Sequence, residues 1–274
     1  MRICRTVADL RLARAGAPRP VGFVPTMGAL HAGHGALLRR AREQCATVVA
    51  SVFVNPLQFD EKKDLEKYPR PFDDDVAFLD EHRCDLLFAP PRDELYPDGF
   101  ATTVSIAGPA RGYEGGHRPG HFDGVATVVA KLFGIVEPDH AYFGQKDAQQ
   151  LALVRRLVRD LEIDVSIVSV ATVRDADGLA LSSRNARLST DERARALGIS
   201  AGLQRAADAW AAGEEDLAAL VASARTEGLD YEYLAAVDPE TFGPPRPGGP
   251  VLLVTAVRVG ETRLIDNVVL SARS

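Results

Sequence analysis

Two histidines in a glycine-containing segment are the residues of this sequence best suited to bind an anion. His31 and His34 follow a short apolar run, residues 21–24, with Gly28 before the pair and Gly33 inside it. Where a strand leads into a helix, the first backbone N–H groups and the positive end of the helix dipole favour negative charge. The segment therefore indicates a phosphate site. Purely structural histidines are the alternative, and a zinc site is disfavoured because the H-E-x-x-H spacing and a cysteine pair are missing.

A second group of polar residues could also meet a phosphate. Lys146 and Asp147 follow Gly144 at the start of a predicted helix, where a lysine opposes the helix dipole and needs a nearby anion. Ser182, Ser183 and Arg184 bring two hydroxyls and a guanidinium into one polar loop. The alternatives are a solvated lysine with a capping aspartate, and an ordinary linker between domains.

Side-chain amides and one basic motif could recognise a small hydroxylated acid. Asn55, Gln58 and Gln150 are neutral hydrogen-bonding groups, although surface amides are common. Arg118 and His121 could place positive charge beside a carboxylate, or could simply order their own loop. These residues are therefore candidate substrate ligands.

Metal and disulfide chemistry receive less support. Residues 73–75 are three consecutive aspartates that could meet Mg²⁺, but acidic residues in the first turn of a helix are explained by the helix dipole alone. Cys4, Cys45 and Cys84 are scattered without metal-ligand spacing, which is typical of buried thiols. No protein metal site is expected.

The elements that must position these residues alternate along the first two thirds of the chain. Strands are predicted at residues 21–24, 47–54, 85–88, 140–143 and 165–170, and helices at residues 36–44, 73–81, 125–136 and 148–161. Such alternation predicts a Rossmann-like, doubly wound α/β domain with a mostly parallel sheet covered on both faces. Each polar motif follows a predicted strand, so we expect the motifs to border one crevice.

The pattern changes after about residue 172. Helices are predicted at residues 190–212 and near 214–225, and strands at residues 231–237, 251–259 and 262–270, the last two joined by a two-residue turn. We therefore expect a Rossmann-like ligand-binding domain over residues 1–172 and a smaller α+β lid domain over residues 173–274. The glycine-rich residues 108–120 are typical of a mobile loop that could close over a site.

Composition excludes several classes of protein. The 274 residues are 46% apolar and carry a net charge of −6 with both signs interspersed, which argues against a nucleic-acid-binding surface. No apolar run approaches the length of a membrane span, and residues 1–10 do not resemble a secretory signal. We expect a soluble cytoplasmic protein without nucleic-acid or membrane partners.

Taken together, five ordered motifs resemble the pantoate–β-alanine ligase family, which belongs to the nucleotidyltransferases with HIGH-type signatures. The resemblance spans nearly the whole chain, and its spacing is far more specific than any one motif. Two positions depart from the family pattern, Leu181 where methionine is frequent and Gln145 where glutamate is frequent; neither removes a charge assigned to the phosphates. The motifs are residues 25–34, residues 53–59, residues 118–122, residues 143–150 and residues 177–185.

The resemblance implies a role for each of these positions. His34 would be the principal catalytic histidine, and pantoate would be bound by Gln58 and Gln150. The remaining catalytic residues would be His31, Lys146, Ser182, Ser183 and Arg184. The ATP-binding residues would be Met27, Gly28, Ala29, Leu30, His31, Ala32, Gly33, His34, Gly144, Gln145, Lys146, Asp147, Val173, Leu181, Ser182, Ser183 and Arg184.

The activity implied is the condensation of pantoate with β-alanine through a pantoyl adenylate, with ATP as co-substrate and Mg²⁺ as its counter-ion. The domain over residues 1–172 would then bind ATP and pantoate. A homodimer is also implied. Two other functions remain open at this point. One is a related nucleotidyltransferase that leaves the nucleotide on its product, and the other is a nucleotide-binding module without turnover.

Overall fold

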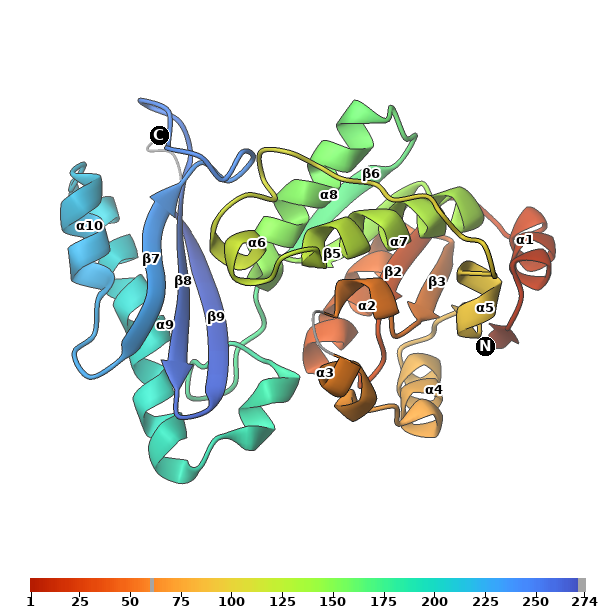
Figure 1. Cartoon of the computed structure of the whole chain (residues 1–274), viewed down its shortest axis with the longest axis horizontal. Coiled ribbons are helices and arrows are strands. Elements are labelled where there is room, and N and C mark those ends of the chain that lie inside the picture. Colours follow the sequence, from red (N-terminus) through yellow and green to blue (C-terminus); the bar gives the residue numbers. More distant parts are fainter. Residues whose placement is uncertain (60–61, 271–274) are drawn as a thin grey trace. The chain divides into compact units, whose positions relative to one another are not determined.

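The computed structural model of the chain describes residues 1–59 and 62–270 (Figure 1). The chain forms two compact units, Met1–Gly144 with Leu153–Val170, and Gln145–Ala152 with Ala171–Ser274. The strands are β1 (Arg2–Cys4), β2 (Val21–Thr26), β3 (Thr47–Val52), β4 (Leu86–Phe88), β5 (His140–Gly144), β6 (Ser166–Val170), β7 (Asp230–Val237), β8 (Val251–Val259) and β9 (Thr262–Leu270). The helices are α1 (Val7–Ala15), α2 (Ala32–Gln44), α3 (Lys62–Lys67), α4 (Phe72–Glu81), α5 (Arg92–Leu95), α6 (Tyr113–His117), α7 (His121–Val136), α8 (Ala148–Asp160), α9 (Thr190–Ala212) and α10 (Leu217–Ala224). Three short 3₁₀ turns are η1 (Pro56–Gln58), η2 (Gln145–Asp147) and η3 (Ser183–Arg187).

The first unit is built on a six-stranded sheet in the order β1-β4-β3-β2-β5-β6, and its strand pairs are all parallel. The order reverses between β2 and β5, which are neighbours although more than a hundred residues of chain separate them. In open parallel sheets this reversal is where ligands bind, beyond the carboxyl ends of the strands. The loop that carries His31 and His34 follows β2 and so begins at this point.

Helices cover both faces of this sheet, as the alternating pattern predicts. On one face, Leu37 and Leu38 of α2 pack with Leu79 of α4 and with Tyr142 of β5 in a buried apolar cluster. Because successive strand residues point to opposite faces, Phe143 lies on the other face, where its ring meets Phe133 of α7 edge-on at 6.5 Å. The predicted parallel α/β fold is therefore confirmed.

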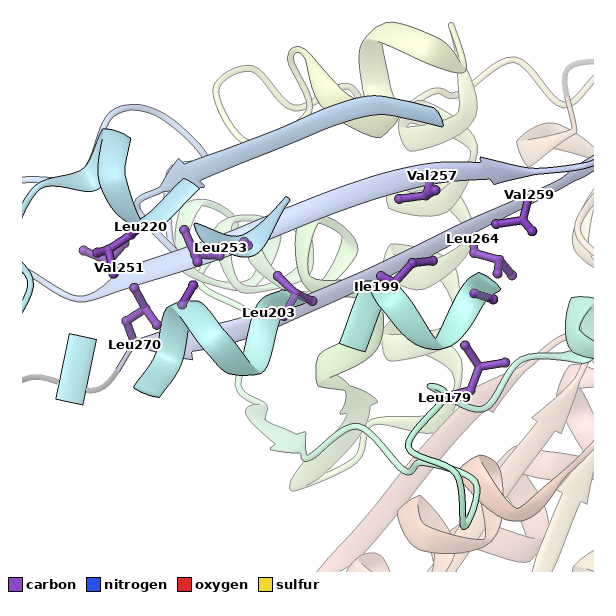
Figure 2. Close-up of a cluster of buried hydrophobic side chains, with 13 residues drawn as sticks. Leu179, Ile199, Leu203, Leu220, Val251, Leu253, Val257, Val259, Leu264 and Leu270 are labelled. Atoms are coloured by element: carbon purple, nitrogen blue, oxygen red, sulfur yellow. The ribbon is translucent and has the colours of Figure 1, made fainter. Parts of the chain in front are cut away.

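The second unit pairs β7, β8 and β9 in an antiparallel sheet. Its long helix α9 begins with a capping box between Ser189 and Glu192 and ends at Gly213, whose φ of 116° is accessible to glycine at little cost. Helices α9 and α10 pack on the three strands through apolar side chains that include Leu203, Leu220 and Leu253 (Figure 2). The predicted α+β arrangement of this segment is confirmed.

Several element boundaries differ from the expectation. The pattern did not predict β1 or α1. Both elements are short, and Leu12 of α1 is 72% exposed. Helix α2 begins at Ala32 instead of residue 36 because His31 caps it, and α7 begins at His121 instead of residue 125 because Gly120 adopts a left-handed conformation there. The glycine-rich residues 108–120 include the short helix α6. Within the described chain, no helix combines the length and apolar character needed to cross a membrane.

Candidate active site

His31 and His34 form the N-terminal cap of α2. The Nδ1 atom of His31 accepts a hydrogen bond from the Gly33 amide at 3.1 Å, and Nδ1 of His34 accepts one from the His31 amide at 3.2 Å. The two rings lie with centroids 4.2 Å apart. A ring nitrogen that accepts a hydrogen bond carries no proton, so the neutral imidazoles hold their proton on Nε2. The cap thus fixes the tautomer of both histidines.

Asp75 holds the loop that precedes this helix. Its Oδ2 accepts a hydrogen bond from the Ala29 amide at 3.0 Å, and its Oδ1 accepts one from the Leu30 amide at 2.7 Å. Gly28 has a φ of 82°, and a Cβ there would lie 2.7 Å from Asp75 Oδ2, so glycine is required. Of the first helical amides, which the sequence favoured for an anion, that of Gly33 donates to a protein acceptor, as do the preceding amides of Ala29, Leu30 and His31.

Asn55 is fully engaged in holding Gln58 after β3. Its Nδ2 donates to Gln58 Oε1 and to the Gly124 carbonyl, each at 3.0 Å, while its Oδ1 accepts from the Tyr96 hydroxyl at 2.9 Å and the Leu57 amide at 3.3 Å. Burial raises the pKa of the Tyr96 phenol, which keeps it a donor. These bonds use both N–H donors and the oxygen of the Asn55 side-chain amide. The role that they give Asn55 is to hold Gln58 in place.

Arg118 and His121 converge on the backbone of Gln58. His121 Nδ1 donates to the Gln58 carbonyl at 2.9 Å, Arg118 Nη2 donates to the same carbonyl at 3.3 Å, and Arg118 Nη1 lies 3.2 Å from His121 Nε2. His121 is only 7% exposed. Both side chains hold the backbone carbonyl of Gln58, and the direct binding of substrate by Arg118 and His121 stays a prediction.

The second unit brings together residues from motifs well separated in sequence. Lys146, Ser182, Arg184, Arg263 and Asp266 line one pocket, together with apolar residues from the loop before η3, α9 and β9. The lining carries three cationic side chains and one carboxylate, and Arg263 is itself paired with Glu232 at 2.6 Å. Lys146 lies 3.7 Å from Asp147 Oδ1, and its side chain is 18% exposed. This pocket confirms that the lysine motif and the serine-arginine motif meet.

The loop before Ser182 is anchored in the core of its unit. Leu179 is 4% exposed and belongs to the same apolar cluster as Ile199 and Leu264 (Figure 2). Ser182 Oγ then accepts a hydrogen bond from the Arg184 amide at 3.2 Å and caps η3. The anchor and the cap set the starting point of the Ser183–Arg187 turn.

The remaining candidates occupy simpler positions. Gly144 ends β5, Gln150 lies half-buried on α8, and the Val173 carbonyl accepts a hydrogen bond from the Leu181 amide at 2.9 Å. Gln58 belongs to the first unit and Gln150 to the second. The joint binding of pantoate by the two glutamines stays a prediction.

Metal ligation finds no support in the donor set. In the part of the chain that the structure describes, no three His, Cys, Asp or Glu side chains gather closely enough to hold a metal ion. Asp75, the buried member of the three aspartates, is instead bonded to backbone amides. Cys4, Cys45 and Cys84 are free and buried, as expected.

Sequence reasoning missed several residues that organise the site. Tyr96 donates a hydrogen bond to Asn55, and Arg174 donates one to the Gly178 carbonyl in the loop before Ser182. Asn267 of β9 donates to the carbonyls of Gln145 and Lys146. No local motif marks them. The one signal was a pair of adjacent polar residues, at 266 and 267, between the apolar pairs at 264–265 and 268–269.

Comparison with known proteins agrees with this geometry. The family model described as pantoate-beta-alanine ligase matches residues 2–269. A curated pantothenate synthetase from Bradyrhizobium diazoefficiens is 50% identical over 99% of this chain and 99% of that protein. A bifunctional pantoate ligase/cytidylate kinase from Gloeobacter violaceus is 50% identical over 98% of this chain, which spans only 55% of that longer relative.

Solved structures give the same result. The pantothenate synthetase of Thermus thermophilus superposes with a TM-score of 0.90 at 48% identity, covering 98% of this chain and 99% of that one. The pantoate-beta-alanine ligase of Francisella tularensis, complexed with beta-gamma ATP and beta-alanine, superposes with a TM-score of 0.80 at 33% identity, covering 98% of each chain. With the fold, the histidine cap and the lysine-serine-arginine pocket all present, the chain belongs to the pantoate–β-alanine ligase family.

Proposed function

We propose that this protein joins pantoate to β-alanine at the expense of ATP. In the first step a carboxylate oxygen of pantoate attacks the α-phosphorus of ATP in line, and the bond to the β-phosphate oxygen breaks to release pyrophosphate. In the second step the amine of β-alanine attacks the acyl carbon, and AMP leaves with the electrons of the broken C–O bond. No protein nucleophile is needed, so catalysis rests on positioning and on charge stabilisation.

In the first unit, we assign the two capping histidines to the ATP phosphates, with His34 as the principal catalytic residue. Their Nδ1 atoms accept backbone hydrogen bonds, so only the Nε2–H groups are suited to donate to phosphate oxygens. Residues 27–34 would follow the nucleotide. Gln58, held by Asn55 and by the Arg118–His121 pair, would bind pantoate together with Gln150.

In the second unit, Lys146 and Arg184 would neutralise the negative charge that shifts onto pyrophosphate as it leaves. Ser182 and Ser183 would add hydroxyl donors, and Gln145, Asp147, Val173 and Leu181 would make further ATP contacts. Gly144, the last residue of the first unit's β5, would complete them. The pocket that gathers Lys146, Ser182 and Arg184 is the observation that carries this proposal. Electrostatic stabilisation of this kind is usually the largest single contribution to catalysis.

Four further properties belong to the proposal. Mg²⁺ would arrive with ATP, bound mainly through phosphate oxygens. Residues 1–172 would bind ATP and pantoate while residues 173–274 act as a lid over the adenylate. A homodimer in the cytoplasm is the proposed working form.

The decisive experiment measures pyrophosphate and AMP formed from ATP and Mg²⁺ with pantoate, with and without β-alanine. Pantoate alone should give pyrophosphate and enzyme-held adenylate, and β-alanine should release AMP and pantothenate. Pantoate-independent transfer that leaves the nucleotide on another acceptor would favour a related nucleotidyltransferase. Nucleotide binding without any pyrophosphate would indicate a binding module.

The assignment of Lys146 is tested by Lys146→Ala. We expect the rate of pantoate-dependent pyrophosphate release to fall by about a hundredfold, equivalent to roughly 3 kcal/mol of lost charge stabilisation, with the thermal transition unchanged. Lys67→Ala removes an exposed lysine from α3 and serves as the matched control. Near-normal pyrophosphate release by folded Lys146→Ala enzyme would remove this residue from the site.

A further inference from the structure

Strand β9 contains two adjacent polar residues, Asp266 and Asn267, whose side chains are both buried; this pair is called the Asp266–Asn267 step. Burial alternates along the strand from Thr262 to Ile265, but Asp266 and Asn267 are each only 5% exposed. Successive strand residues point to opposite faces, so the strand must be covered on both sides at this step. A buried polar side chain costs free energy unless it is hydrogen-bonded, so the partners of these two residues matter.

Asn267 is bonded to the turn that carries Lys146. Its Nδ2 donates to the carbonyls of Gln145 and Lys146, each at 2.9 Å, and its Oδ1 lies 3.4 Å from Gln145 Nε2. The turn η2 is three residues long and continues directly into α8, so the backbone that carries Lys146 forms the first turn of a longer helical segment. Asn267 adds a tertiary constraint to the backbone beneath the Lys146 side chain, because it holds two carbonyls of this turn.

Asp266 is bonded to the loop that leads to Ser182. Its carboxylate accepts two hydrogen bonds from Arg174, at 2.7 and 3.0 Å, and its side chain is 3% exposed. Arg174 also donates to the Gly178 carbonyl at 3.2 Å, and its backbone pairs with Ala180. A bidentate arginine–carboxylate pair fixes both distance and orientation, so it holds both ends of this short loop.

We infer that the Asp266–Asn267 step is the positioning element of the nucleotide-phosphate site. Asn267 sets Lys146, and Asp266 sets the approach to Ser182 and Arg184, so one rigid strand aligns two segments that are more than thirty residues apart in the sequence. Asp266 lines the pocket, whereas Asn267 acts through the η2 backbone. The inference rests on the proposed function, because it takes Lys146 and Arg184 as the phosphate ligands.

Two variants of Asn267 test this role. Asn267→Ala removes the hydrogen bonds to the Gln145 and Lys146 carbonyls. Asn267→Asp keeps the size of the side chain but replaces the donor with a carboxylate oxygen that faces the two carbonyls. We expect the Kd for a non-hydrolysable ATP analogue, measured by calorimetry, to rise about tenfold or more in both. The rate of pyrophosphate release should fall with it, while the KM for pantoate stays within about twofold of wild type.

A matched control separates positioning from general stability. Asp238 is also buried and also ties two backbone groups, the amides of Glu240 and Thr241, but it lies in the loop after β7 and does not line the pocket. Asp238→Ala should lower the thermal transition without changing the Kd for the analogue. If Asn267→Ala does only the same, Asn267 is merely structural and the inference fails.

A double-mutant cycle decides whether Asn267 acts through Lys146. In the Lys146→Ala background, Asn267→Ala should raise the Kd for the analogue by less than about twofold, because the group that it positions is gone. Fully additive losses would overturn the inference. Failure of wild-type protein to release pyrophosphate with pantoate would instead refute the proposed function, and the cycle on analogue binding would still report on Asn267.

Discussion

Gly124 of α7 is the position where one added methyl group should most directly disturb Gln58, the proposed pantoate-binding residue. A Cβ at this residue would lie 2.3 Å from the Leu57 carbonyl oxygen, 2.4 Å from the Leu57 carbonyl carbon and 2.6 Å from the Gln58 amide nitrogen. All three atoms are backbone, so no side chain can rotate away. In Gly124→Ala, the η1 turn and α7 must therefore move apart.

The size of the effect follows from these distances. Relieving the contacts requires a displacement of roughly 1 Å, and a misplacement of this size at a substrate-positioning group costs about a hundredfold in rate. That factor corresponds to about 2.7 kcal/mol of transition-state stabilisation. The same overpacking should lower the free energy of unfolding by about 1–3 kcal/mol. The bond from Asn55 to the Gly124 carbonyl would be strained as well.

The assay is pantoate-dependent pyrophosphate release at saturating ATP, with unfolding followed by circular dichroism. We expect kcat/KM for pantoate to fall about a hundredfold while the KM for ATP changes little. Gly134→Ala is the control, because it lies on the same helix with nothing within 4 Å of the added Cβ and should stabilise the helix by up to about 1 kcal/mol. A folded Gly124→Ala enzyme with near-wild-type kcat/KM would refute the reasoning.

Three other perturbations have definite expected outcomes. Asp75→Asn turns one acceptor that faces a loop amide into a donor. It should therefore lower the free energy of unfolding by about 1–3 kcal/mol in urea titrations and raise the KM for ATP. The control Asp74→Asn, at an exposed position, should do neither. Burial alone would raise the pKa of Asp139, but a backbone amide and Arg19 outweigh it and lower the pKa below the ordinary 3.8. Its carboxylate therefore stabilises the fold above pH 3.8, and this stabilisation is lost as the pH falls through the lowered pKa. In urea titrations of Asp139→Asn, the free energy of unfolding should depend less on pH in this range. Burial raises the pKa of the Cys84 thiol from 9.0 to about 12, so the thiol should resist Ellman's reagent in native protein and react in urea, and its contribution to stability should decline as the pH rises above 9.0.

Much of the fold was predictable because it depends on periodicity. The apolar runs of β2, β3, β5 and β6 and the helical spacing of α8 are local properties of the sequence, and they imply a parallel sheet between helices. Short elements such as β1 lack enough residues to show a period. The start of α2 was misplaced because histidine is not among the common capping residues, and only the fold shows that His31 accepts the Gly33 amide.

The candidate site divides in the same way. The sequence by itself determined which chemical groups are present and in what order, including the histidine pair, Lys146 and the serine-arginine loop, and these sufficed for the family resemblance. The tertiary structure decided which partners occupy their hydrogen-bonding groups. Asp75 takes amides of the loop after β2, and Asn267 takes the carbonyls under Lys146 from 121 residues away. Such pairings depend on distance in space, which local spacing cannot encode, and they decide which atoms remain suited to a phosphate.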